Sequence, residues 1–395
     1  MEGLPMELND ARIPIKIWAF DVEEDALNQA RNAANHLFSF HHIALMPDVH
    51  SGYGLPVGGV AALEGVIIPY AIGVDIGCGM RAIKTSLIGI EANVLKKIKD
   101  DIEAVIPVGF GHNKTRSDLP SIDRADFELS QVLKNEWQSA AYQIGSLGGG
   151  NHFIEIQEDE SGYLWVMIHS GSRNIGNKVA THFNQEAVRL NEEWSWDIKI
   201  PKSNQLAFLP LVGKNKHYGE TYMREMNWCL EFAKTSRKMM MEKVMVVFEN
   251  HFLDVSFENE LDVHHNYASL ENHFGKNVMV HRKGATSAKL NEFGIIPGCQ
   301  GTSSYIVKGL GNQDSFQSCS HGAGRKLSRT KARNILDLEE EKKKLDDQGI
   351  IHSINDRNDL DESSGAYKDI ETVLEYEEDL VSVVQKLVPR AVVKG

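Results

Sequence analysis

The sequence lacks features that mark several large classes of protein. Cysteine is scarce, with four in 395 residues, all far apart, which argues against the disulfide framework of small secreted domains. No apolar run approaches the ~18–20 residues of a membrane-spanning helix. The N-terminal residues show no basic start followed by an apolar block, so we expect no signal peptide. These absences predict a cytoplasmic protein in a reducing environment, without a membrane partner.

Positive charge is also in short supply. The chain has 42 Lys and Arg against 55 Asp and Glu, a formal net charge of −13. Proteins that bind nucleic acids through general charge attraction need positive charge to displace counterions from phosphates, so this balance argues mildly against such a binder. Net charge does not exclude a local basic patch. The composition, 42% hydrophobic and 25% charged, is that of a globular protein.

Linkers, repeats and low-complexity blocks are missing as well, so we expect one compact domain over residues 1–395. Apolar runs of strand length predict strands at 43–46, 57–63, 66–69, 81–87, 153–156, 164–169, 278–282, 295–297 and 303–307. Helical spacing of apolar residues predicts helices at 90–105, 122–144, 174–194, 218–247, 329–345 and 367–387. Strands and helices do not alternate in a βαβ rhythm, which favours an α+β fold, with a helical excursion at about 190–250.

A carboxylate and a thiol lie three residues apart in the segment Asp75-Ile76-Gly77-Cys78-Gly79. Thiolate favours softer metals and carboxylate favours harder ones, so this pair suits Mn, Fe, Co or Zn better than Mg or Ca. A single Cys is also often a small buried hydrophobic residue, and the segment alone leaves both readings open.

Histidine is abundant, at 16 residues, and most lie in short motifs with Gly, Asn or Ser. A glycine run at 145–150 leads to Asn151-His152, and glycines allow a backbone to approach a phosphate or metal closely. His169 ends an expected strand, and the turn after it brings Arg173 to a helix start, where an anion can bind. The alternative there is a simple helix-capping turn. His264 and His265 are adjacent on an expected strand, so at most one of them faces a given metal.

His321 stands before a Gly322-Ala323-Gly324 turn that exposes it for nucleophilic attack, and Arg325 and Arg329 follow it. The run His281-Arg282-Lys283 is either a solvated face or a local source of positive charge for a polyanion. Asp48 and His50 share a strand face and either position a phosphate or act as acid and base, or form a surface turn.

Together the candidate ligands exceed what one tetrahedral metal requires. They are Asp75, Cys78, His152, His169, His265 and His321. Two metals bridged by Cys78 would use them better, and two-metal sites are usual in phosphoryl and nucleotidyl transfer. The residues therefore predict a metal-dependent enzyme that acts on phosphates and has a dinuclear metal site in a central cleft. They do not identify its substrate.

The motifs together resemble the RtcB family of RNA ligases, in kind and in order, from about residue 13 to residue 395. They read MPDVHSGYGLPVGG, GVDIGCGM, GSLGGGNHF, HSGSRNIG, HHNY, RKGA, GTSSYIV, SCSHGAGR, AYKDI and VVKG. The resemblance implies an enzyme that uses GTP and two Mn²⁺ per subunit. It would join an RNA 3′-phosphate or 2′,3′-cyclic phosphate to a 5′-hydroxyl, in RNA repair or tRNA splicing.

The resemblance also implies a role for each matching residue. His321 would attack the α-phosphate of GTP and form a covalent guanylyl-histidine. The metals would be held by Asp75, Cys78, His152, His169 and His265. The nucleotide would contact Asn151, Glu155, Ser304, His321, Gly322, Ala323, Gly324, Tyr367 and Lys394. RNA phosphates would contact Arg173, Lys283, Arg325 and Arg329.

Two departures from the family pattern bear on substrate preference. Cys299-Gln300 stands where many relatives carry Ser-Met, and the chain is compact beside longer relatives. Two other functions stay open: a guanylyltransferase that caps 3′-phosphate ends without sealing them, and a non-enzymatic RNA-end-binding protein with a structural metal. A metallophosphatase fits less well, because it needs no guanine pocket. We expect a monomer, and an archease-like activator is a candidate partner.

Overall fold

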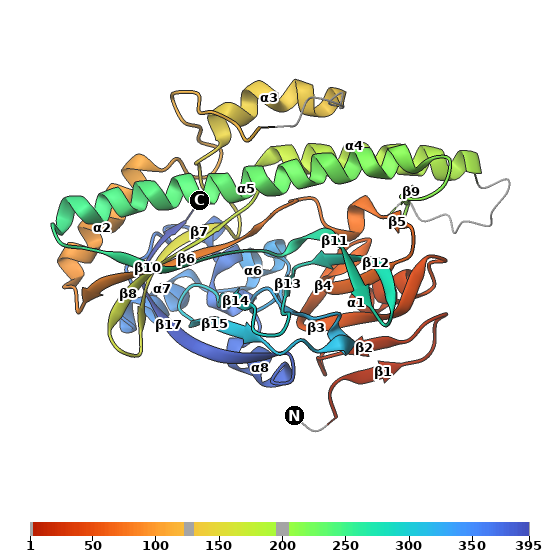
Figure 1. Cartoon of the computed structure of the whole chain (residues 1–395). Helices are drawn as coiled ribbons and strands as arrows, with labels where there is room; N and C mark the ends of the chain where they lie inside the picture. The colour runs from red at the N-terminus through yellow and green to blue at the C-terminus, as the bar shows by residue number, and fades with distance from the viewer. Residues whose placement is uncertain (1–2, 122–129, 195–204, 395) are drawn as a thin grey trace.

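The computed structural model describes residues 3–121, 130–194 and 205–394. Strands form two large sheets, and helices cover them (Figure 1). Among the described strands, every pairing between named strands is antiparallel except that of β2 with β3. Mixed helix and sheet with mainly antiparallel pairing is the α+β arrangement that the sequence predicts.

The larger sheet has seven strands, in the order β10-β6-β8-β7-β17-β15-β14. Their bounds are β10 (Phe257–His264), β6 (Gly79–Ile88), β8 (Tyr163–Ser170), β7 (Phe153–Asp159), β17 (Val381–Lys394), β15 (Ser304–Gly309) and β14 (Phe293–Ile296). The second sheet has six strands, in the order β1-β2-β3-β4-β12-β11. Their bounds are β1 (Met6–Leu8), β2 (Ile15–Ile17), β3 (Ser39–Tyr53), β4 (Leu55–Leu63), β12 (Lys276–Lys283) and β11 (Asn266–His273).

Two short strand pairs complete the sheet structure. They are β13 (Ala285–Ser287) with β16 (Ser318–Ser320), and β5 (Val66–Ile67) with β9 (Leu209–Pro210). The helices are α1 (Glu24–Ala34), α2 (Ala92–Val105), α3 (Gln131–Gln143), α4 (Asn174–Trp194), α5 (Lys216–His251), α6 (Arg329–Ile335), α7 (Leu338–Asp347) and α8 (Ile370–Tyr376). Short 3₁₀ turns lie at η1 (Pro69–Ala71), η2 (Gln313–Ser315), η3 (Arg357–Glu362) and η4 (Ser364–Ala366).

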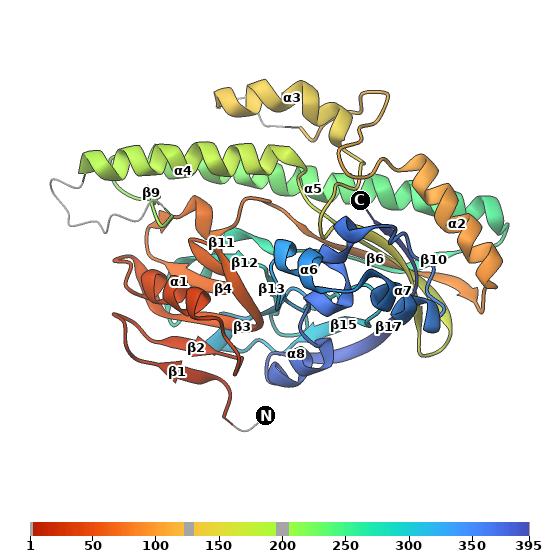
Figure 2. The same ribbon diagram turned by 180° about the vertical axis from the view of Figure 1, so that it is seen from behind.

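Helices α4 and α5 run side by side across the sheets, and α3 lies on their far side (Figures 1 and 2). The 36-residue α5 buries residues at three- and four-residue spacing along most of its length, as a core helix does. Met240, Val244 and Phe248 of α5 pack in one hydrophobic cluster with Ile154 and Val166 of the larger sheet. The described part of the segment near 190–250 is therefore helical and packs in the core, and the excursion expected at about 190–250 stays a prediction. Residues 195–204 lie outside the described residues.

The C-terminal segment corrects the expected helix at 367–387. Helix α8 ends at Tyr376, and the rest of the segment enters strand β17. This strand is rich in β-branched valine and pairs with β15 on one side and β7 on the other. Hydrogen bonds from two neighbouring strands outweigh a helical pattern of apolar residues, and those neighbours are distant in sequence.

The expected helix at 329–345 is two helices, α6 and α7. They are separated at Leu336-Asp337, where the Asp337 side chain accepts hydrogen bonds from the backbone N–H groups of Glu339 (2.9 Å) and Glu340 (3.0 Å). An N-cap of this kind starts a new helix and stabilises it by about 1 kcal/mol. Of the helix expected at 122–144, α3 forms the later part, and 122–129 lie outside the described residues.

Two further observations concern the cysteines and the helices. The four cysteines, all within the described residues, are free thiols. None of the helices in the described ranges combines the length and apolar character needed to span a bilayer.

A buried ion pair ties the six-stranded sheet to the β16 segment. Arg282 is fully buried and donates to Glu271 at 2.5 and 3.1 Å, to Ser318 Oγ at 2.8 Å and to the carbonyl of Phe316 at 3.0 Å. Burial alone would raise the pKa of Glu271, but hydrogen bonds from His273 and Arg282 lower it well below 4.5. Arg282 therefore serves the interior of the fold and is not a source of surface charge.

We predict that Glu271→Gln lowers the urea midpoint of unfolding and costs about 3 kcal/mol, because it leaves a buried guanidinium without its carboxylate. In the wild type this stabilisation is present at neutral pH. It is lost as the pH falls below 4.5, the ordinary pKa of the carboxyl, because the lowered pKa belongs to the folded state. Glu64→Gln removes an exposed pair with Lys276 and serves as the control, with an expected loss within about 1 kcal/mol. Equal effects of the two variants would contradict the prediction.

Candidate metal centre and active site

Four neighbouring strands of the seven-stranded sheet each have one terminus at the same edge of the sheet, the edge that runs across the strand ends. In the register, His264 of β10 pairs with Gly79 of β6, Gly79 pairs with Ser170 of β8, and Phe153 of β7 pairs with His169. Because the pairing is antiparallel, the end of β10, the start of β6, the end of β8 and the start of β7 meet there. The residues at these four positions are His265, Cys78, His169 and His152.

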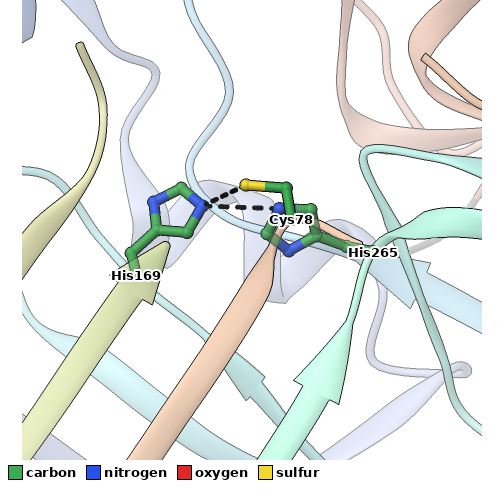
Figure 3. Close-up of side chains that lie close together, drawn as sticks. All are labelled: Cys78, His169 and His265. Carbon is green, nitrogen blue, oxygen red and sulfur yellow. Dashed lines mark hydrogen bonds between the residues drawn. The ribbon is translucent and has the colours of Figure 1, made fainter. Parts of the chain in front are cut away.

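One group at this edge consists of Cys78, His169 and His265, whose side chains converge from three strand ends (Figure 3). The Sγ atom of Cys78 lies 3.3 Å from Nε2 of His169, and the two Nε2 atoms of His169 and His265 are 3.4 Å apart. All three side chains are buried. Their donor atoms lie within 4.8 Å of one another, a spacing that allows a single metal ion to bind all three.

A second group consists of Asp75, Cys78 and His152. Nε2 of His152 is 3.3 Å from Oδ2 of Asp75 and 3.5 Å from Sγ of Cys78. The donor atoms of this group also lie within 4.8 Å of one another. Cys78 belongs to both groups, so its sulfur is placed where one thiolate can contact two ions.

The backbone around Asp75 fits this carboxylate closely. Ser172 donates to Oδ1 of Asp75 through its backbone N–H and its hydroxyl, each at 3.1 Å. A Cβ atom at Gly171 would lie only 2.2 Å from Oδ2 of Asp75. Only glycine leaves room for the carboxylate at that position.

The protonation states suit metal binding. Burial lowers the pKa of His169 and of His265 well below 6.5, with further lowering from neighbouring histidines, so both imidazoles are neutral. Nδ1 of His169 lies 2.9 Å from the carbonyl of Asn151, which directs Nε2 toward Cys78. Burial would raise the pKa of Asp75, but hydrogen bonds from His152, Cys78 and Ser172 bring it below 3.8.

Cys78 is the one donor whose ligating form needs a cation. Burial and then the charge of Asp75 raise the pKa of its thiol well above 9.0. A bound divalent ion supplies the positive charge that makes the thiolate favourable. The set of sulfur, imidazole nitrogen and carboxylate oxygen fits Mn, Fe, Co or Zn, and these residues therefore fit a metal centre.

His321 lies beside this centre, directly after β16. Its Nδ1 is 2.5 Å from Oδ2 of Asp48, and its backbone N–H donates to the same oxygen at 3.1 Å. Asp48 is fully buried, and the His321 ring centroid is 4.8 Å from that of His265. The carboxylate fixes Nδ1 as the protonated nitrogen, so the lone pair is on Nε2. The burial of Asp48 argues against the surface-turn interpretation of this residue, and its functional role stays a prediction.

A cavity of about 710 Å³ collects the candidate residues. It is lined by every residue expected to bind metal, nucleotide or RNA phosphate, except His152, Ser304 and Arg173. His152 contacts Asp75 and Cys78, and Oγ of Ser304 accepts a hydrogen bond from the backbone N–H of Gly298, which lines the cavity.

One wall of the cavity carries the residues expected around guanine. Gln157 is fully buried, and its Nε2 donates to Oε2 of Glu155 at 2.5 Å and to Oγ of Ser304 at 3.0 Å. Burial raises the pKa of Glu155 to about 8. Lys394 donates to the carbonyls of Gly150 (2.9 Å) and His152 (3.4 Å). Gln157 was not among the sequence candidates, although it shares a strand face with Glu155.

Another part of the cavity wall is formed by Tyr367 and by three of the basic residues expected to bind RNA, which are Lys283, Arg325 and Arg329. Arg325 donates to Oη of Tyr367 at 3.1 Å and to Glu362 at 3.2 Å. Arg329 also donates to Glu362 at 3.2 Å, and its side chain is about half exposed, at 52%. Burial lowers the pKa of Lys283 to about 7, and its Nζ donates to the carbonyl of Tyr53.

Arg173 is held away from this wall. It has a left-handed backbone, with φ 58°, and donates to Ser146 Oγ at 3.1 Å and to the carbonyl of Gly109 at 2.8 Å. A non-glycine residue in this conformation stores about 1–3 kcal/mol of strain, which often marks a functional segment. Its contact with RNA phosphate stays a prediction.

Residues that act on the site indirectly, by positioning other residues, are difficult to predict from the sequence. Asp48 was considered with His50, but its pairing with His321 spans 273 residues and has no local pattern. Glu362 and Arg237 carried no motif signal. Of the adjacent histidines, His265 joins the metal-binding group, and Nδ1 of His264 lies 3.2 Å from Nη2 of Arg237 instead.

The chain is similar in sequence to known proteins. The family model described as "tRNA-splicing ligase RtcB" matches residues 29–136 and 121–395. The RNA-splicing ligase RtcB of Escherichia coli K12 is 37% identical over 412 residues, covering 98% of this chain and 99% of the relative. The tRNA-splicing ligase RtcB of Nanoarchaeum equitans is 31% identical over 465 residues, covering 97% and 95%.

The buried thiol, imidazoles and carboxylate beside a carboxylate-bound histidine define a protein with a candidate metal centre and a candidate nucleophile. The sequence matches specify which one: the chain belongs to the RtcB family. The family assignment made from the motifs is confirmed.

We predict that Cys78→Ala weakens Co²⁺ binding at both groups by more than about 100-fold. Loss of a residue that only hydrogen-bonds to a metal ligand already lowers metal affinity by about 10–100-fold, and loss of the ligand itself should cost more. Asp75→Asn is expected to weaken one group only. Binding is measured by titration calorimetry, and the sulfur-to-cobalt absorption band reports the thiolate. Cys299→Ser alters a cysteine of the cavity wall that belongs to neither group and is the control. A cobalt band that persists in Cys78→Ala would contradict the assignment.

Proposed function

We propose that this protein is an RNA ligase. It joins an RNA 3′-phosphate or 2′,3′-cyclic phosphate end to a 5′-hydroxyl end, with GTP as co-substrate and two Mn²⁺ per subunit. The observation that carries the proposal is the pairing of His321 with buried Asp48, next to two ligand groups that share Cys78. The relatives named RNA-splicing and tRNA-splicing ligases support the class of substrate.

The first step makes a covalent guanylyl-histidine. Nε2 of His321 attacks the α-phosphorus of GTP, the bond to the bridging oxygen breaks, and pyrophosphate leaves. Asp48 holds the proton on Nδ1 throughout and stabilises the positive charge that develops on the ring. Bound divalent metal would neutralise phosphate charge and orient the α-phosphate.

Two transfers follow. An oxygen of the RNA 3′-phosphate attacks the phosphorus of the guanylyl group, and the P–N bond electrons return to Nε2 of His321. The 5′-hydroxyl oxygen then attacks the activated 3′-phosphorus, GMP leaves, and a phosphodiester forms. A 2′,3′-cyclic phosphate is first opened by water to a 3′-phosphate.

Guanine would be bound by Glu155, Ser304, Tyr367 and Lys394. Glu155 in its ionised form accepts hydrogen bonds from the N1–H and N2–H edge of guanine, which adenine does not offer in that arrangement. Gln157 holds Glu155 and Ser304 at one spacing. Lys394 offers a donor to the carbonyl oxygen of the base. This arrangement favours GTP over ATP.

RNA phosphates would be bound by Arg325, Arg329, Lys283 and Arg173. Arg325 and Arg329 line the cavity and share Glu362, which holds them at fixed spacing. A phosphate next to Lys283 would raise the pKa that burial lowers to about 7, and the lysine would then be charged when the RNA end binds.

An end-capping guanylyltransferase would use the same residues, so a sealing assay separates it from a ligase. RNA carrying a 3′-phosphate is supplied with and without a second RNA bearing a 5′-hydroxyl. A ligase yields the joined strand, whereas a capping enzyme stops at the RNA 3′-guanylyl end. A protein that only binds RNA ends yields neither product and no covalent GMP.

The first prediction of the proposal is a covalent adduct. Incubation with α-³²P-GTP and Mn²⁺, followed by denaturing electrophoresis, is expected to label the protein through an acid-labile phosphoramidate. His321→Ala is expected to remain unlabelled, and His217→Ala, which changes an exposed histidine on α5, is expected to label like the wild type. Absence of label in the metal-loaded wild type would overturn the nucleotidyl-transfer proposal.

A second prediction concerns Asp48. Asp48→Asn should keep the fold but slow adduct formation by about 10²–10⁴-fold, because an amide no longer selects the ring tautomer with its lone pair on Nε2. The rate is measured by quenched single-turnover labelling at saturating GTP. A rate within about threefold of the wild type would show that Asp48 does not orient the nucleophile.

A third prediction concerns pH. Because burial raises the pKa of Glu155 to about 8, this carboxyl is mostly protonated at pH 7 in the free protein. If guanine needs the carboxylate, GTP affinity rises as pH increases through about 8, and the gain is absent for ATP. Calorimetric titrations at pH 6.5 and 9 test this, with Glu155→Gln expected to bind GTP weakly at both. Equal pH dependence in Glu155→Gln would assign the effect to another group.

A further inference from the structure

Arg237 of helix α5 is a fully buried arginine that donates four hydrogen bonds to oxygen atoms. Nη1 donates to the carbonyls of Gly77 at 2.9 Å and Ser170 at 2.8 Å. Nη2 donates to Oδ1 of Asp262 at 2.7 Å and lies 3.2 Å from Nδ1 of His264, while Nε donates to Oδ2 of Asp262 at 3.1 Å. Of the five N–H donors of the guanidinium, four donate to oxygen atoms, and the fifth lies near Nδ1 of His264.

Three of the residues that Arg237 contacts are next to candidate ligands in the chain. Gly77 precedes Cys78, Ser170 follows His169, and His264 precedes His265. One guanidinium from a helix thus contacts the ends of three strands, and each of these ends carries one member of the Cys78, His169 and His265 group. Planar and rigid, the guanidinium fixes the relative positions of these backbones in a way that a flexible ammonium does not.

The helix backbone is close enough for this only because of Gly77. A Cβ atom there would lie 3.0 Å from Cβ of Ala233 and 3.1 Å from the carbonyl oxygen of Cys229, both on α5. Gly77 also has φ +78°, which a glycine adopts without strain. Small residues on both sides therefore bring α5 against the ligand-bearing turn.

We infer that Arg237 is a positioning residue for the metal centre: it holds the strand ends that carry Cys78, His169 and His265 at the spacing a metal ion requires. The inference rests on the proposed metal centre and deepens it. Partners outside the ligand set of a metal commonly set its affinity, and their loss costs about 10–100-fold.

Arg81 provides a matched control. It is also a buried arginine, and it binds Asp262 through Nη1 at 3.1 Å and Glu260 through Nε at 2.8 Å. Its partners in the described structure are side-chain carboxylates, and it does not contact the carbonyls of Gly77 or Ser170. Arg81→Lys therefore disturbs Asp262 but leaves the hydrogen bonds between Arg237 and the ligand-bearing strand ends in place.

The test measures Co²⁺ and Mn²⁺ binding to the full chain by calorimetry and by the cobalt absorption spectrum, without RNA or GTP. Arg237→Lys keeps the charge but has three donors in place of five, and it is expected to bind both metals about 10–100-fold more weakly, with an altered sulfur-to-cobalt band. Arg81→Lys is expected to bind within about threefold of the wild type. Equal affinities and spectra for Arg237→Lys and the wild type would overturn the inference.

A second variant decides the matter if Arg237→Lys does not fold. Asp262→Asn weakens the anchor of the guanidinium on β10 and is expected to reduce metal affinity several-fold, and unchanged affinity would overturn the inference. Failure of the wild type itself to bind Co²⁺ or Mn²⁺ is a distinct result, because it rejects the metal centre of the proposed function. Metal binding by the wild type with parallel losses in Arg237→Lys and Arg81→Lys would reduce Arg237 to a general stabilising role.

Discussion

The antiparallel register of β10, β6, β8 and β7 is the constraint on which the rest of the site depends. It places His265, Cys78, His169 and His152 at one sheet edge although they span much of the chain. Side chains alternate along a strand, so a slip of one residue in any pairing would turn a ligand to the opposite face. Helix α5 packs across the sheet, and the contacts of its residue Arg237 add a second restraint on the same edge.

The candidate nucleophile and the candidate metal ligands come from different parts of the fold. Asp48 lies on β3 of the six-stranded sheet, and His321 follows the short β13–β16 pair. Arg282 joins β12 to the backbone that leads into β16, and a shared hydrophobic cluster fills the space between the two sheets. The distance between nucleophile and metal centre is thus set by the packing of one sheet against the other.

Short motifs predicted most of the candidate site, because ligand atoms and glycine turns are encoded within a few residues of each other. The α+β class and most strands of the first half were predictable for the same local reason. Strand β17 was not, since its hydrogen bonds come from β7 and β15, and the pattern of its residues also fits a helix. Asp48, Gln157 and Arg237 were missed or undervalued because each acts through a contact that only the folded chain creates.

The wide separation of these residues along the chain has a consequence for folding. The first half of the chain contains Cys78 and His169. It lacks His265, the third member of their group, and the candidate nucleophile His321. Contacts of such long sequence separation form late, because the entropy of closing large loops must be overcome first. A partly folded chain without these contacts therefore lacks a complete candidate site, and the site is assembled only in the final topology.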